Sequence, residues 1–121
     1  MVVKIPGVDA DKGLDLCDGN MDFYMDALRL YITNTSTVLE KVRTVSAETL
    51  KDYVINVHGI KSISELVGAE EARVTAKELE AIAKGGDLAG VLAKNDAFIK
   101  MVETLLENIR SWLAKNDTAG S

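Results

Sequence analysis

Apolar residues recur at steps of three and four along most of the chain, which is the spacing of helices with one buried face. This pattern predicts a short helix over about 9–17 and long helices over about 20–44, 46–68, 70–84 and 87–115. Residues 1–8 are predicted to form an extended lead-in, and the polar residues 116–121 a frayed tail. The fold class predicted is all-α, an antiparallel four-helix bundle with an additional short N-terminal helix, in a single domain over 1–121.

Capping residues and glycines support the predicted helix ends. Side chains that can cap a helix start stand at Asp9, Asn20, Ser46 and Asp87. Glycines that can end a helix follow at Gly19, Gly68 and Gly85-Gly86. Residues 33–37 are five poor helix formers in a row. Because the apolar spacing continues across them, we expect one unbroken helix there.

The only histidine of the chain, His58, lies inside the third long helical pattern. It follows the apolar Val57, about 100° round the helix, so it is expected at the edge of the buried stripe or outside it. Lys61 and Ser62, three and four residues later, are expected on the same side. An imidazole is neutral and nucleophilic near pH 7. This group of residues therefore suits a reactive or phosphate-bearing site.

The residues around this histidine, taken in their order along the sequence, resemble the signature of histidine-containing phosphotransfer (HPt) domains. That signature reads approximately His-x-hydrophobic-Lys-small-small, with a Gly-Ala pair closing the helix. The residues in these places are His58, Ile60, Lys61, Ser62, Gly68 and Ala69, and the similarity continues through Ile5-Pro6-Gly7, Gly13-Leu14, Leu79-Glu80 and Gly86-Asp87. Nearly the whole chain is covered, and the resemblance implies the same bundle.

The resemblance implies roles for individual residues. Nε2 of His58 would accept the phosphoryl group, and the Lys61 ammonium would stabilise it. Ser62, where most members have glycine, would let a partner approach closely, and Gly68 would help shape the site as the helix cap. Gly59 is a departure, since bulkier residues are usual after the histidine. In family members a Glu or Gln at the place of Glu80 can bond Nδ1 of the histidine, so Glu80 is the candidate for orienting the imidazole.

The predicted function is that of a stoichiometric phosphocarrier and not of an enzyme. The chain contains neither a Walker pattern nor Gly-x-Gly-x-x-Gly, and no metal-ligand spacing. No cofactor is expected in this chain, and Mg²⁺ would come with the partner receiver domain. The partners implied are response-regulator receiver domains, a hybrid histidine kinase, or both.

Charge and hydropathy weigh against nucleic acid and membranes as partners. The formal net charge of −5 weighs against nucleic acid, which requires a basic surface. No apolar run approaches the about 18 residues of a membrane span, and no signal peptide is recognised, so a cytoplasmic protein without membrane contact is expected. A monomer with a transient interface is expected, because relay partners must leave quickly. Cys17 is the only cysteine and is expected to be a free buried thiol.

Two other classes of function remain open. The chain could be a helical docking module that binds receivers or a histidine kinase without phosphotransfer, although such a module would not need His58. A receiver phosphatase would require an exposed acid-amide or glutamine pair, and the chain has no glutamine. For the phosphocarrier and for both alternatives, the candidates for the docking surface are Ile55, and also Tyr24, Leu28 or Tyr31 if they are not buried.

Overall fold

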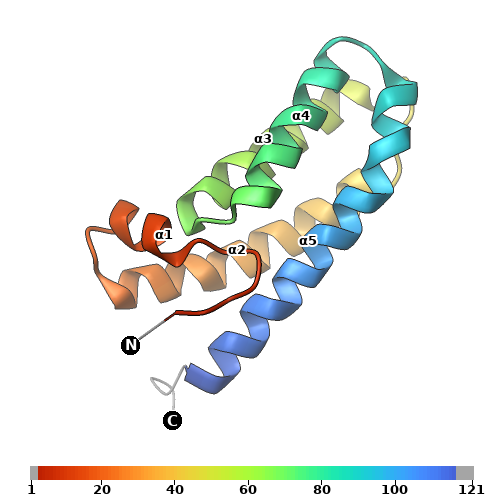
Figure 1. Ribbon diagram of the computed structural model, residues 1–121. Coiled ribbons are helices and arrows are strands. Elements are labelled where there is room, and N and C mark those ends of the chain that lie inside the picture. Colours follow the sequence, from red (N-terminus) through yellow and green to blue (C-terminus); the bar gives the residue numbers. More distant parts are fainter. Residues whose placement is uncertain (1–2, 117–121) are drawn as a thin grey trace.

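The computed structural model describes residues 3–116, and all of its regular structure there is helical. Within these residues, five helices follow one another (Figure 1). Their bounds are α1 Ala10–Leu16, α2 Met21–Val42, α3 Leu50–Val67, α4 Glu70–Lys84 and α5 Leu88–Asn116. The all-α class is therefore confirmed. The predicted frayed tail falls outside the described residues, except for Asn116, which is the last residue of α5.

The helix starts use three of the predicted capping side chains. Asp9 accepts a hydrogen bond from the backbone N–H of Lys12, and Asn20 accepts one from Phe23. Asp87 accepts one from the backbone N–H of Gly90 at the start of α5. These side chains satisfy donors that have no partner inside the helix.

α2 continues through its run of poor helix formers, as predicted. The hydroxyl of Thr33 donates to the carbonyl of Arg29, and that of Thr37 to the carbonyl of Thr33, both at 3.2 Å. Bonding back to the preceding turn keeps these short polar side chains compatible with a helix.

The prediction that Ser46 caps α3 is wrong. Ser46 and Thr49 form a turn instead, in which Thr49 N–H donates to the Ser46 carbonyl at 3.2 Å. The Thr49 hydroxyl in turn accepts from the Ser46 N–H at 2.9 Å. This reciprocal pairing makes a turn before the helix, so α3 begins at Leu50 with no side-chain cap.

The four long helices pack on one another around a shared apolar core. α3 packs against α2 and α4, and α5 packs against the same two helices (Figure 1). The fully buried large side chains come from all four of them and include Leu28, Val57, Leu79, Phe98 and Ile109. Burial of these faces supplies the main drive for folding.

α1 is fixed to the end of α3 by two close backbone approaches. Gly68 ends α3 with φ +81°, and a Cβ there would lie 2.0 Å from the Asp9 carbonyl oxygen. The Asp9 N–H donates to the Gly68 carbonyl at 2.7 Å. A Cβ on Gly13 would lie 2.3 Å from the Tyr24 ring, whose hydroxyl donates to the Val67 carbonyl at 2.8 Å. Only glycine fits at both positions.

One buried amide joins three helices. Asn95 on α5 donates to the carbonyl of Val42 at the end of α2, at 2.7 Å. Its Oδ1 accepts from the hydroxyl of Tyr53 on α3, at 2.8 Å. Both polar partners are thereby satisfied in the core, where an unpaired group is costly. The sequence pattern gave no indication of this link.

Candidate functional site

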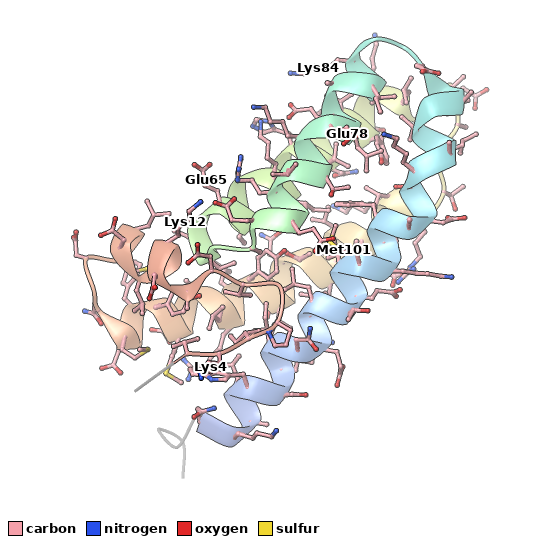
Figure 2. All side chains as sticks on the ribbon, in the orientation of Figure 1. Lys4, Lys12, Glu65, Glu78, Lys84 and Met101 are labelled. Carbon is pink, nitrogen blue, oxygen red and sulfur yellow. The ribbon has the colours of Figure 1, made fainter. Side chains whose placement is uncertain are left out.

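The candidate site lies between α3 and α4, which carry its residues in pairs. His58 and Lys61 come from α3, and Glu80 and Lys84 from α4. Figure 2 shows that Lys84 projects from the end of α4 away from α5, whereas Glu78 lies between α4 and α5. Glu78 forms an ion pair with Lys94 of α5. Glu78 and Glu80 of α4 thus pair with side chains of different neighbouring helices.

α4 can present Glu80 to α3 because its inner face is made of small side chains. Ala72, Ala76 and Ala83 are buried there, together with Leu79. Short side chains let the two helices approach closely, and residues three and four apart share a face. Glu80 lies next to this buried row and is itself only 7% exposed.

The imidazole of His58 is held on one side and open on the other. Its side chain is 54% exposed, while the preceding Val57 is fully buried, as the helical pattern predicted. Nδ1 lies 2.8 Å from Oε2 of Glu80. The resemblance made Glu80 the candidate for bonding Nδ1 of His58, and the structure contains this contact.

The carboxylate of Glu80 is surrounded by donors. Lys61 Nζ lies 2.9 Å from Oε1, and Lys84 Nζ lies 3.2 Å from Oε2. Burial alone would raise the pKa of Glu80, but hydrogen bonds from Lys61, Lys84 and His58 outweigh it and lower the pKa to about 2. Glu80 is therefore ionised at neutral pH.

An ionised carboxylate fixes the tautomer of the neutral ring. It can only accept hydrogen bonds, so the 2.8 Å contact requires the proton on Nδ1. Nε2 of His58 then carries the free lone pair. The arrangement can present a nucleophilic nitrogen beside two ammonium groups, which is the chemistry needed to take up an electrophilic anionic group.

The two lysines differ in exposure. The side chain of Lys61 is 25% exposed and that of Lys84 is 64% exposed. Lys84 is the residue of this group that the sequence analysis did not single out. The available signal was its spacing of four residues from Glu80, which is frequent for ion pairs on a helix surface.

The three predicted site-shaping residues lie in different places. Ser62 is exposed one turn beyond His58. Gly59 is exposed as well, and a Cβ there would meet nothing within 4 Å. Gly68 is not brought to the site, since ten residues of helix separate it from His58 by about 15 Å. Its requirement for glycine comes from its positive φ and from the close contact of α1.

Of the predicted docking residues, only Ile55 is available at the surface. It lies one turn before His58 and is 68% exposed. Tyr24, Leu28 and Tyr31 are fully buried, so they cannot belong to a docking surface. The Tyr31 hydroxyl is bonded to Ser64 Oγ at 2.8 Å inside the core, where burial raises the pKa of Tyr31 to about 12.

Within residues 3–116, no group of three or more His, Cys, Asp or Glu side chains could hold a metal ion. None of the helices described combines the length and the apolar character that a membrane crossing requires. Cys17 is buried, with a free thiol, as expected.

Comparisons with protein-family models, with curated proteins and with solved structures gave no match to this chain.

Proposed function

We propose that this chain is a histidine phosphotransfer protein. It accepts a phosphoryl group on Nε2 of His58 from an aspartate of a receiver domain and passes it to another receiver. The observation that carries the proposal is the Nδ1–Oε2 contact of 2.8 Å on a half-exposed ring. A buried carboxylate that orients an otherwise open imidazole is an arrangement for nucleophilic chemistry.

In the proposed reaction, the Nε2 lone pair attacks phosphorus in an aspartyl phosphate. The Nε2–P bond forms, the P–O bond breaks, and the carboxylate leaves on the receiver. Nδ1 keeps its proton, so the ring gains positive charge, which the ionised Glu80 beside it stabilises. Transfer to the next receiver is the reverse of these steps.

Lys61 is assigned to the phosphoryl group. Its ammonium is one helical turn from His58 and is held near the ring by Glu80 Oε1 at 2.9 Å. A phosphoryl group brings a charge of about −1.5 to −2, which an ammonium can follow and offset. The proposal assigns the Mg²⁺ needed for transfer to the receiver domain.

The proposed fold is the antiparallel four-helix bundle of phosphotransfer domains, formed by α2–α5, with α1 as the additional short helix. It is supported by the packing of each long helix against two others. On this proposal the receiver docks around His58, with Ile55 at the interface, and the chain acts as a cytoplasmic monomer that its partners leave quickly.

The test is phosphate transfer from a phosphorylated receiver domain in the presence of Mg²⁺, followed by intact mass and by radiolabel. We expect an acid-labile, base-stable label on the wild type and none on His58→Gln. Adding a second, unphosphorylated receiver should remove the label again. Lys61→Ala should slow transfer severalfold, whereas Lys51→Ala, which changes an exposed lysine of α3, should not.

Binding without labelling would contradict the proposal. If several unrelated receivers bind the folded protein but leave no phosphate on it, the chain is a docking module. Circular dichroism of each variant confirms that a missing label does not reflect a missing fold.

A further inference from the structure

Lys84 is the charged group at the site to which neither the sequence pattern nor the resemblance gives a role. Its Nζ lies 3.2 Å from Glu80 Oε2, the same oxygen that lies 2.8 Å from His58 Nδ1. Because both groups contact one oxygen, the Lys84 ammonium lies close to Nδ1 of the imidazole. We propose that Lys84 is a second phosphate-binding cation, which exchanges Glu80 for a phosphoryl oxygen when His58 is phosphorylated. This inference rests on the proposed function.

The charges around His58 favour this role. Lys61 and Lys84 together carry two positive charges against the single negative charge of Glu80. A phosphoryl group adds about −1.5 to −2, and the ring gains a positive charge when Nε2 is phosphorylated while Nδ1 keeps its proton. The phosphorylated site is therefore close to neutral with both lysines present. Without Lys84 it carries an uncompensated negative charge.

The geometry favours Lys84 over Lys61 as the group that moves. Lys84 shares Oε2 with the imidazole at the longer distance of 3.2 Å, whereas Lys61 pairs with Oε1 at 2.9 Å. The side chain of Lys84 is also the more exposed, at 64% against 25%. A lysine has a flexible four-carbon stem and three rotatable donors, so its ammonium can follow a phosphate.

Lys77 provides a matched control on the same helix. It lies three residues before Glu80 and is exposed. It forms no ion pair or side-chain hydrogen bond among the residues that the structure describes. Its removal changes the net charge as much as removal of Lys84 does.

The experiment uses the intact protein labelled with phosphoramidate, a small phosphoryl donor that needs no receiver. The ionisation of the phosphoryl group on His58 is then followed by ³¹P NMR against pH. A nearby cation favours the dianion, so Lys84→Met should move the midpoint to higher pH by about 0.2–0.7. Lys84→Arg should keep the wild-type midpoint, and Lys77→Met should shift it by less than half as much.

Each outcome decides the inference. An unchanged midpoint in Lys84→Met, or an equal shift in Lys77→Met, overturns it. If only a phosphorylated receiver labels His58, the same titration is carried out on protein labelled in that way; if neither donor labels His58, both this inference and the proposed function are overturned. If phosphoramidate labels His58 but no receiver does, the proposed function fails, and the titration still decides whether Lys84 binds the phosphoryl group.

Discussion

At the residue scale, the buried Glu80 carboxylate determines how the imidazole is presented. It accepts from His58 through Oε2 and from Lys61 through Oε1, so ring and ammonium are fixed by one side chain. A neutral imidazole without this contact would distribute its proton between two nitrogens. The role proposed for Nε2 therefore depends on a residue of the neighbouring helix.

Replacing Glu80 tests this dependence. Glu80→Leu should lower the rate of phosphorylation of His58 on the order of tenfold, because neither tautomer nor ring orientation is then fixed. Glu80→Gln keeps an acceptor for Nδ1 and should lie between wild type and Glu80→Leu. Labelling rates with phosphoramidate give the comparison. Equal rates in all three proteins would show that the contact has no part in the reaction.

Glu80 should also make stability depend on pH. Its pKa of about 2 lies below the ordinary 4.5, so its ion pairs stabilise the fold fully above about pH 4.5. That contribution is lost as pH falls from there towards 2. Urea unfolding of wild type and Glu80→Gln at several pH values measures it. The free-energy difference between the two proteins should shrink on acidification, and a constant difference would contradict the assigned pKa.

At the scale of the element, α3 ends at a glycine that the structure requires, and it contains a second glycine, next to His58, that the structure does not require. Gly68 is required by its positive φ and by the contact of α1. Gly59 has no such requirement, since open space surrounds its missing side chain. Gly59 inside α3 and Gly68 at its C-terminal cap are therefore expected to respond to substitution by alanine in opposite directions.

The two alanine variants of α3 test that expectation. Gly59→Ala should raise the free energy of unfolding by up to about 1 kcal/mol, because glycine is a poor helix former. Gly68→Ala should lower it by about 2–4 kcal/mol through backbone strain and the clash with the Asp9 carbonyl. Urea denaturation measures both. A destabilising Gly59→Ala would mean that the space beside His58 is not open.

The helices themselves were largely predictable, because apolar spacing and capping residues are local signals. The cap at Asn20 and the stop at Gly68 depend on neighbours within a few residues. The prediction of Ser46 as a cap was wrong because Ser46 pairs with Thr49 in a turn before α3. Contacts across helices depend on how each helix is rotated, so periodicity alone could not bring Glu80 to His58, and Lys84 was missed altogether.

At the scale of the whole molecule, polar groups inside the core fix how the helices pack. Asn95 bonds the end of α2 and the Tyr53 hydroxyl of α3 from α5. Apolar packing is non-directional, whereas these hydrogen bonds require one relative placement of three helices. The position of α3, and with it that of His58, is therefore held partly by the hydrogen bond between Tyr53 and Asn95.

Asn95→Ala should lower the free energy of unfolding by about 2–4 kcal/mol, because it leaves the Tyr53 hydroxyl and the Val42 carbonyl buried without partners. Asn34→Ala, at an exposed position of α2, is the matched control and should change stability by less than about 0.5 kcal/mol. Thermal and urea unfolding measure both. Similar effects in the two variants would show that the buried amide does not hold the helices together.

The most direct test of the account is to identify the nitrogen that carries phosphate. Protein with ¹⁵N-labelled histidine is phosphorylated by a phosphorylated receiver and examined by ¹⁵N and ³¹P NMR. Because His58 is the only histidine, the ring signals need no further assignment. We expect the proton on Nδ1 before reaction and coupling of phosphorus to Nε2 afterwards. A proton on Nε2, phosphate on Nδ1, or no phosphorus on the ring would contradict the proposed phosphotransfer site.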